Sequence, residues 1–280
     1  MKTGKIAFQG ALGAYSHEAC VNARPNLEPL PCQTFEDVID TVNAGEADLG
    51  MLPIDNSTYG RVADMHRLLP DSGLRIVDET FVRVRISLLA PKGVDISDIH
   101  TVRAHLVLLP QSAAFLKAHN INGIAAVDSA GAAEALAQDL TPGEGVLASS
   151  LAGHIHGLNV LVEGVEDHGH NTTRFVVMGR EDNPSTASDA GLGMVTSFVF
   201  RVRNIPAALY KAMGGFATNG VNMTKLESYM VDGSFMATRF YAEIEGHPDD
   251  PAVARAMEEL RYFTSELVVL GCYAAAQKRH

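Results

Sequence analysis

Short apolar segments that end in polar residues recur along the first 180 residues of the chain. The segments with the length and composition of buried strands are 5–9, 47–54, 124–127 and 145–148. Stretches with apolar residues at helical spacing lie between them, and helix-capping residues precede several of these stretches. The repeated order of strand, polar cap and helix predicts a parallel α/β sheet with ligand-binding groups at the strand ends.

The expected helices begin at residues that suit the N-cap position. The candidate caps are Ser16, Asp128 or Ser129, and Ser149 or Ser150. Further helices are expected at 35–44 and 108–120. The glycines of the 10–15 loop lack the G-x-G-x-x-G spacing, so they are poor evidence for a dinucleotide site. Residues 75–89 look extended, and alternating apolar and charged residues there indicate a strand with one solvent-facing side.

The order of elements changes after residue 180. Segment 181–193 is polar, contains Pro184 and has no apolar period, which is typical of a linker. The remainder predicts strand 195–202, a helix from Pro206 to 219, strand 223–230, a turn at Asp232-Gly233, strand 235–245, helix 251–263 and strand 267–273. This βαββαβ order predicts a ferredoxin-like domain.

The composition is that of a soluble globular protein. Its 280 residues allow two domains, and 46% of them are hydrophobic. The net charge of -11 argues against nucleic acid and anionic membranes as partners, and an anionic ligand would need a locally positive pocket. The three cysteines have no metal-like spacing, and no apolar run has signal-peptide or membrane-spanning character. We therefore expect a cytoplasmic protein with free thiols.

The most informative polar run is Asn171, Thr172, Thr173 and Arg174. It places an amide, two hydroxyls and a cation directly before the apolar run 175–178, which reads as a buried strand. Polar donors at the mouth of a buried strand are where an α/β protein usually holds a small ligand. Thr is also common in strands and Asn in turns, so the run alone does not identify a site.

Four segments together resemble the prephenate dehydratase family with a C-terminal ACT regulatory domain. They are 10–16; 52–57 with Gly60 and Val62; 148–152 with 157–158 and 171–175; and 206–212 with 220–228. The first three look like the family's G-x-x-G-[ST]-[FY]-S loop, its P-I-E-N-S turn and its T-R-F element. The fourth looks like the G-A-L and E-S-R-P elements of the ACT domain. The match extends from about residue 5 to 273.

The resemblance implies an α/β fold with three parts. A two-lobed catalytic domain, like type II periplasmic binding proteins, would cover 5–180. A linker would follow at 181–193, and a ferredoxin-like βαββαβ ACT domain would cover 194–273. The implied reaction converts prephenate to phenylpyruvate with loss of water and carbon dioxide, in L-phenylalanine biosynthesis. It needs no cofactor because aromatisation drives it. L-Phenylalanine as allosteric effector and a homodimer or homotetramer are also implied.

The same resemblance gives the expected site residues. Thr173 is the expected catalytic residue, because its hydroxyl can donate a hydrogen bond to the departing ring hydroxyl. The expected substrate-binding residues are Ser16, Asn56, Ser57, Ser129, Ser149, Asn171, Thr172, Arg174 and Phe175. The expected effector-binding residues are Ala207, Ala208, Leu209, Asn222, Glu227 and Ser228.

Simpler structural roles remain open for several of these residues. The serines and Asn56 would also serve as ordinary helix caps. Thr173 and Arg174 are adjacent, and adjacent side chains of a strand point to opposite faces. Both therefore face the ligand only if the strand has ended or bulged there, and a structural salt bridge is the alternative for Arg174.

The chain departs from the family pattern at several positions. Ala14 stands at the hydroxyl position of the first loop, and Arg103-Ala104-His105-Leu106 matches the family's S-H-P-Q stretch only at the histidine. Ala207 replaces a glycine, and Tyr229-Met230 replaces Arg-Pro, which leaves the effector open.

The histidines do not predict a metal site. Those considered are His17, His105, His154, His156, His168 and His170. No carboxylate or cysteine cluster accompanies them at ligand spacing, so no metal is expected, while a histidine as general acid stays open.

Two rival functions also stay open. Arogenate dehydratase uses the same chemistry on an amino-acid substrate. A non-catalytic small-molecule sensor would share the fold. Such a receptor would not require the intact Thr173-Arg174-Phe175 element, which argues against it.

Overall fold

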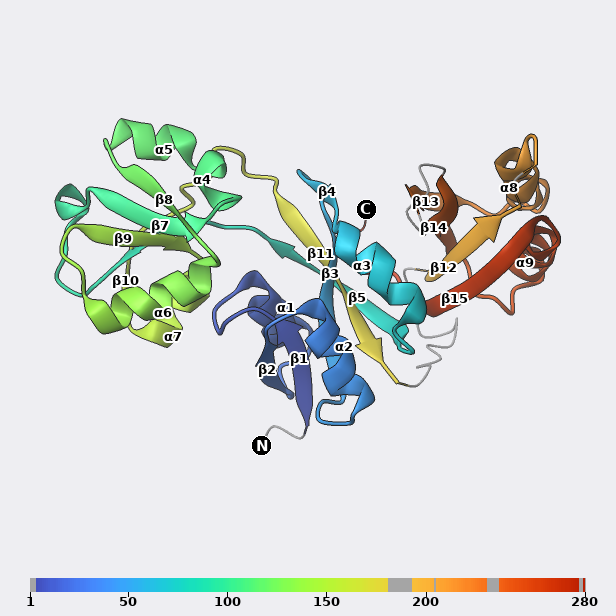
Figure 1. Ribbon diagram of the computed structural model, residues 1–280, viewed down its shortest axis with the longest axis horizontal. Coiled ribbons are helices and arrows are strands. Elements are labelled where there is room, and N and C mark those ends of the chain that lie inside the picture. The colour runs from blue at the N-terminus through green and yellow to red at the C-terminus, as the bar shows by residue number, and fades with distance from the viewer. Residues whose placement is uncertain (1–3, 181–192, 204, 231–236, 277–278, 280) are drawn as a thin grey trace. The chain divides into compact units, whose positions relative to one another are not determined.

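The computed structural model describes residues 4–180, 193–203, 205–230, 237–276 and 279 (Figure 1). The chain divides into two compact units, 1–62 with 80–175 and 63–79 with 176–280. The division falls within strands β5 (Arg75–Arg83) and β11 (Thr172–Gly179). Nearly all of the predicted linker, and the predicted turn at Asp232-Gly233, lie outside the described residues.

The first sheet has the strand order β2-β1-β3-β11-β5, and β4 pairs with β3. Its N-terminal elements are β1 (Lys5–Gln9), α1 (Tyr15–Ala23), β2 (Glu28–Cys32), α2 (Phe35–Asn43), β3 (Leu49–Asn56) and β4 (Gly60–Arg61). Strand β1 pairs in parallel with β2 and with β3, as the sequence predicted. Strand β3 runs two residues past its predicted end because Asp55 and Asn56 pair with β4 in an antiparallel hairpin.

The second sheet has the strand order β10-β6-β9-β7-β8. Its strands are β6 (Ser87–Ala90), β7 (Thr101–His105), β8 (Asn122–Ala126), β9 (Glu144–Ala148) and β10 (Asn159–Glu163). Strand β7 is parallel to β8 and β9, but β6 and β10 join antiparallel. The prediction of a parallel sheet is therefore right for the strands that alternate with helices and wrong for these two. The two-lobed α/β architecture is confirmed, and we call the two sheets with their helices the first and second lobes.

Helices cover both faces of the second sheet (Figure 1). They are α4 (Leu108–Gln111) and α5 (Ala113–Ala118) on one face, and α6 (Ser129–Asp139) and α7 (Ser150–His156) on the other, with a 3-10 turn, η2, at Ile96–Asp98. Neighbouring residues of β6 alternate between the two cores: Leu88 packs with the α4–α5 side and Leu89 with the α6–α7 side. This burial on both faces explains why the fully buried strands β6 and β9 have few polar residues.

The predicted helix at 108–120 is two short helices, which the sequence pattern missed. The break lies at Ser112, whose φ of -119° and ψ of 21° are not helical. A distant carboxylate stabilises the break: Asp167 accepts hydrogen bonds from the Ala114 N–H at 3.1 and 3.3 Å. The Asp167 N–H donates in turn to the carbonyl of Gln111.

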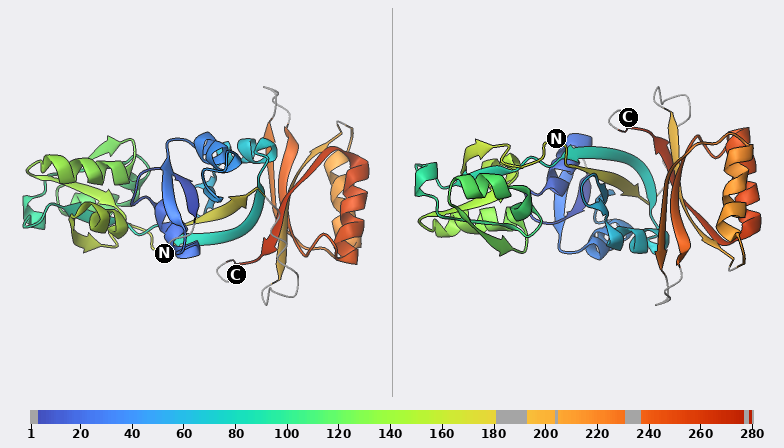
Figure 2. Two further views of the ribbon diagram at one scale, coloured as in Figure 1. Left: turned by 90° about the horizontal axis from the view of Figure 1, so that it is seen from below. Right: turned by 90° about the horizontal axis from the view of Figure 1, so that it is seen from above.

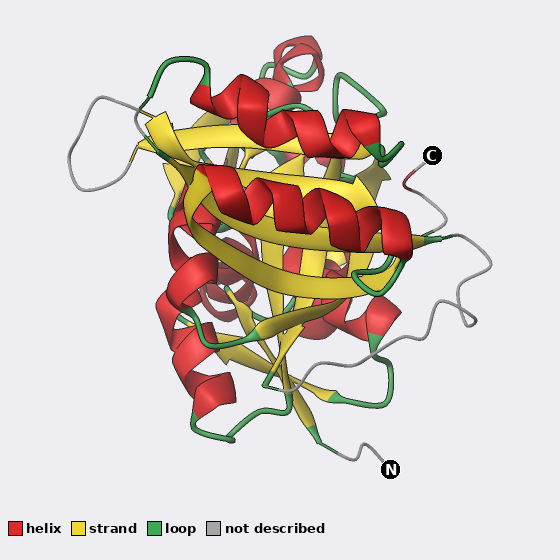
Figure 3. Cartoon of the chain, turned by 90° about the vertical axis from the view of Figure 1, so that its right-hand side faces the viewer, coloured by secondary structure: helices red, strands yellow, loops and turns green. Residues whose placement is uncertain are grey.

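The second unit contains an antiparallel sheet of order β13-β14-β12-β15. Its elements are β12 (Met194–Val202), α8 (Ala208–Thr218), β13 (Met223–Met230), β14 (Ala237–Glu245), α9 (Pro251–Phe263) and β15 (Thr264–Ala274). Helices α8 and α9 lie side by side on one face of the sheet, over a core that includes Phe198, Phe200 and Phe216 (Figures 2 and 3). The predicted ferredoxin-like βαββαβ order is confirmed.

A buried polar cluster joins this sheet to the segment 63–79 of the same unit, which holds α3 (Ala63–Leu68), the 3-10 turn η1 (Leu69–Asp71) and the start of β5. The side chains of Glu79 and Glu243 are 0% and 2% exposed. Arg279 pairs with both, with its Nε 3.1 Å from Glu79 Oε1. Tyr241 donates a hydrogen bond to Glu243. Buried carboxylates are tolerated here because a cation and a hydroxyl compensate them.

Helix α8 begins later than the sequence predicts. Pro206 was expected in its first turn, but the helix starts at Ala208 and Ala207 is its N-cap residue. Ala207 has φ +61° and ψ 22°, the left-handed region that favours glycine. This is the position where the ACT pattern usually has glycine.

Replacing Ala207 by glycine is expected to stabilise the protein. Removing the Cβ relieves left-handed strain, so the Ala207→Gly variant should gain about 0.5–1 kcal/mol in free energy of unfolding. Ala217→Gly, on an exposed right-handed position of the same helix, is the matched control and should lose about 1 kcal/mol. Urea denaturation of both variants measures the difference, and equal losses would contradict the assigned strain.

Candidate active site

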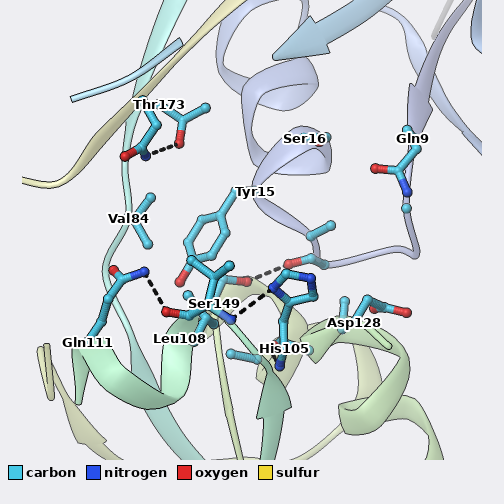
Figure 4. A pocket seen from close by; sticks show the side chains of 18 of the residues that line it. Gln9, Tyr15, Ser16, Val84, His105, Leu108, Gln111, Asp128, Ser149 and Thr173 are labelled. Atoms are coloured by element: carbon cyan, nitrogen blue, oxygen red, sulfur yellow. Dashed lines mark hydrogen bonds between the residues drawn. The ribbon is translucent and has the colours of Figure 1, made fainter. Parts of the chain in front are cut away.

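A pocket of about 320 Å³ lies where strands of both lobes end (Figure 4). The last residue of four strands lines it: Gln9 of β1, Asn56 of β3, His105 of β7 and Ala148 of β9. The first residues of α1 and α6 also line it, together with Asn171, which directly precedes β11, and Thr173, the second residue of that strand. Carboxyl ends of strands in α/β sheets are where small ligands bind, as the strand-and-cap pattern predicted.

Asn56 is the centre of the hydrogen-bond network in this pocket. Its Nδ2 donates to Thr173 Oγ1 at 3.0 Å and to Asn171 Oδ1 at 2.7 Å. Its Oδ1 accepts from the backbone N–H groups of Thr58 and Tyr59, both at 2.9 Å. Backbone N–H groups only donate, so they fix which end of the Asn56 amide faces Thr173.

The same directionality continues into the second lobe. Asn171 Nδ2 donates to Gln111 Oε1 at 2.6 Å, and Gln111 Nε2 donates to the carbonyl of Val107 at 2.9 Å. Asn171 is 3% exposed, so its amide depends on these partners. Thr173 Oγ1 accepts from Asn56, which leaves the hydroxyl proton of Thr173 directed toward another acceptor.

Three serines predicted to bind substrate line the pocket with different hydrogen bonds. Ser16 is not the cap of α1, because the helix begins at Tyr15 with Ala14 as N-cap, and the Ser16 side chain lines the pocket. Ser129 Oγ accepts from the His105 N–H at 2.9 Å, so its own proton can be donated to a ligand. Asp128, not Ser129, caps α6.

Ser149 is the N-cap of α7, as predicted, and it is 4% exposed. Its Oγ accepts from the Ala152 N–H at 3.1 Å and donates to the carbonyl of Gly13 at 2.5 Å. Its proton is therefore used within the protein.

Four other predicted binding residues do not line the pocket: Ser57, Thr172, Arg174 and Phe175. Ser57 and Thr172 join β3 to β11 through the contacts Ser57 N–H to Thr172 O and Thr172 N–H to Ser57 Oγ, both 2.9 Å. Arg174 is 7% exposed, and its Nη1 lies 3.4 Å from Asp55 Oδ2. Phe175 belongs to the core. Any effect of these four on binding would be indirect.

The pocket carries little positive charge. None of the lining residues in the described part of the chain is a lysine or an arginine. The expected positive pocket is therefore not built from lysine or arginine side chains, and its lining includes the carboxyl group of Asp128. At the start of α1 the N-cap residue Ala14 offers no side-chain cap, and Ala14, Tyr15 and Ser16 all line the pocket. Uncapped N–H groups at a helix start attract anions.

Several lining residues were not predicted from the sequence. Tyr15 donates to the carbonyl of Arg85 at 2.8 Å, and burial, with smaller contributions from the Glu18 and Glu166 carboxylates, raises its pKa far above the ordinary value. The hydroxyl is therefore held in its neutral form, with its proton donated to the Arg85 carbonyl. Gln111 and Tyr59 were also missed, because their partners are distant in sequence. Tyr15 could have been identified as a site residue from its position in the G-x-x-G-[ST]-[FY]-S loop.

The six predicted effector residues lie in the second unit. Ala208 is buried and Leu209 packs against the core under α8, whereas Ala207 is exposed at the start of that helix. Asn222 precedes β13, while Glu227 and Ser228 lie on that edge strand. Asn222 and Ser228 are exposed and Glu227 is half-buried.

No group of three or more His, Cys, Asp or Glu residues in the described ranges could hold a metal ion. Among the helices of the described residues, none has the length and apolar character required to cross a membrane.

The sequence relationships agree with the site. Residues 6–183 match the sequence family described as "Prephenate dehydratase". A protein of Komagataeibacter europaeus named "Bifunctional N-acyl-homoserine lactone acylase/prephenate dehydratase" is 46% identical over 98% of this chain and 97% of its own length. The chain belongs to the prephenate dehydratase family.

Two further family members are similar over nearly the whole chain. "Arogenate dehydratase/prephenate dehydratase 1, chloroplastic" of Arabidopsis thaliana is 34% identical over 96% of this chain and 71% of its own length. The crystal structure of prephenate dehydratase in complex with L-Phe from Arthrobacter aurescens has a TM-score of 0.87 and 29% identity, covering 98% of this chain and 91% of that one.

We expect Arg174 to contribute to the stability of the fold and not to ligand binding in the pocket. Arg174→Met removes a charged partner of Asp55 and should lower the free energy of unfolding by roughly 2–3 kcal/mol. Lys117→Met, at an exposed position, should change it by less than about 0.5 kcal/mol. Denaturant titration gives the stabilities. If folded Arg174→Met had an unchanged free energy of unfolding but a much higher KM for its substrate, Arg174 would instead take part in ligand binding.

Proposed function

We propose that this family member converts prephenate to phenylpyruvate, with loss of water and carbon dioxide. The observation that carries the proposal is the Thr173 hydroxyl, which accepts from Asn56 Nδ2 and is thereby oriented as a donor in the pocket. The reaction requires such a donor at the departing ring hydroxyl. Aromatisation of the ring drives the reaction, so the residues present need only bind, orient and polarise the substrate.

Thr173 would act by hydrogen bonding and not as a strong acid. A neutral threonine hydroxyl is a very weak acid, so it polarises the leaving hydroxyl while the ring gains aromaticity. Its position is fixed before substrate arrives, because Asn56 is itself held by two backbone N–H groups. A preorganised donor avoids the cost of reorientation in the transition state.

The substrate carboxylates would be bound by neutral donors. The start of α1 provides uncapped N–H groups beside Ser16, and Ser129 provides a hydroxyl proton. Leaving one carboxylate without a charged partner suits the chemistry, because that carboxylate loses its charge as carbon dioxide departs. Arogenate carries the same ring and leaving groups, so it remains an alternative substrate.

The part of the second unit that holds its antiparallel sheet, residues 194–273, would serve regulation as an ACT domain. We propose a catalytic domain over 5–180, a linker over 181–193 and an ACT domain over 194–273, in a homodimer or homotetramer. The related Arthrobacter structure holds L-Phe. We propose that L-phenylalanine inhibits this protein through residues 207–209, Asn222, Glu227 and Ser228, by favouring one conformational state. Calorimetric titration with L-phenylalanine, using L-alanine as the control ligand, tests this.

Hydrolysis of N-acyl-homoserine lactones is a second candidate function. The name of the Komagataeibacter relative includes this activity. Apart from Asp128 and His105, the polar groups that line the pocket are amides and hydroxyls, and they lie beside Val84, Val107, Leu108 and Val127. Among the described residues, no lysine or arginine lines it. Such a lining suits a neutral amphiphile with an alkyl chain. Mass spectrometry of free homoserine lactone released from an N-acyl derivative tests this activity on the preparation assayed with prephenate.

Loss of the Thr173 hydroxyl is expected to reduce catalysis. Thr173→Val keeps the shape of the side chain and should lower kcat for phenylpyruvate formation about 10²- to 10³-fold, the usual effect of removing one transition-state donor. Thr173→Ser restores a hydroxyl and should stay within about tenfold of the parent protein. The matched control is Thr172→Val, because Thr172 is adjacent but does not line the pocket.

Unchanged kcat in Thr173→Val would keep the reaction but move the chemistry to another residue. A parent protein that binds prephenate, yet turns over neither prephenate nor arogenate, would favour the sensor.

A further inference from the structure

We propose that His17 is a positioning residue for substrate binding, acting through Gly13 on the pocket wall between the two lobes. His17 does not line the pocket. It lies in the first turn of α1 and is 7% exposed. Its ring stacks on Phe8 of β1, with centroids 5.4 Å apart and planes 9° apart. Packing therefore fixes the ring before any ligand binds.

The fixed ring holds one peptide group of the loop before α1. Gly13 N–H donates to His17 Nδ1 at 2.9 Å. Gly13 has φ +95°, a conformation that L side chains rarely adopt. A Cβ at this residue would lie 2.5 Å from the Cα of Ala152 in α7, so the loop backbone approaches the second lobe closely. Glycine is required here for both reasons.

The other side of this loop bonds to the second lobe. Ser149 Oγ donates to the carbonyl of Gly13 at 2.5 Å while it caps α7 by accepting from the Ala152 N–H. Ala11 and Ala14 of the loop pack against the core beneath α6 and α7. Phe8 contacts His17, His17 bonds to Gly13, and Gly13 bonds to Ser149. This series of contacts connects the first sheet to the pocket wall of the second lobe.

The connection matters for binding because Gly13, Ala14 and Ser149 all line the pocket. The loop also carries the uncapped start of α1, which is proposed to receive a substrate carboxylate. Without an acceptor at His17 Nδ1, the Gly13 N–H loses its partner and the loop can relax away from Ser149. Such a change weakens the binding of the substrate and of the transition state equally, so KM rises while kcat stays nearly constant.

The test compares two substitutions of His17 with one substitution of a second buried residue of α1. His17→Leu removes the acceptor and should raise KM for prephenate about tenfold, with kcat within about twofold. His17→Asn supplies Oδ1 as an acceptor near the position of Nδ1 and should restore KM to within about threefold. Cys20→Ala, one turn later on α1 and equally buried, controls for lost packing and should leave KM unchanged.

A second readout does not require turnover, since the KM prediction rests on the proposed function. Hydrogen exchange of the segment 10–16, followed by mass spectrometry, should show protection in the parent protein and in His17→Asn, and faster exchange in His17→Leu. Equal exchange in His17→Leu and the parent would overturn the proposal. So would a KM rise in Cys20→Ala as large as that in His17→Leu. An inactive parent protein with the expected exchange pattern would refute the reaction and keep the positioning role.

Discussion

The site depends on the direction of one amide, that of Asn56. Two backbone N–H groups of its own turn bond to its oxygen, so its nitrogen must face Thr173 and Asn171. The direction of the Asn171 amide follows, and then that of Gln111 across the pocket. Because the first two donors are backbone N–H groups, the direction of these hydrogen bonds cannot be reversed without leaving buried polar groups unpaired. Each unpaired group would lower the free energy of unfolding. The orientation of the Thr173 hydroxyl, which we propose as the donor to the substrate, is thus determined by a β-hairpin turn.

The sequence predicted the elements well where local pattern controls them. Strands β1, β9 and β12 and helices α2 and α9 lie within two residues of their expected positions, because apolar period and capping residues act over short distances. The errors arise from distant partners. Asp167 interrupts the helix expected at 108–120, and pairing with β4 extends β3 into what looked like a polar turn.

The same division applies to the site. Alternation along a strand predicted that Thr173 and Arg174 would not both face a ligand unless the strand had ended or bulged there. The structure places Thr173 in the pocket and Arg174 against Asp55. Family resemblance supplied Asn56, Asn171 and Ser129, which line the pocket, but also Ser57 and Phe175, which do not. Sequence gave no means of pairing His17 with Gly13 or Asn171 with Gln111, since such partners are set by the packing of the lobes.

The absence of lysine and arginine from the described pocket lining has a consequence for the approach of an anion. The whole chain carries a net charge of -11, so a dianion meets long-range repulsion that no lysine or arginine among the described residues lining the pocket offsets. Added salt screens this repulsion over a Debye length of about 8 Å at physiological ionic strength, while short hydrogen bonds to neutral donors are barely affected. Encounter with such a substrate becomes faster as ionic strength rises, the reverse of electrostatic steering, and recognition is left to dipoles that act only at contact.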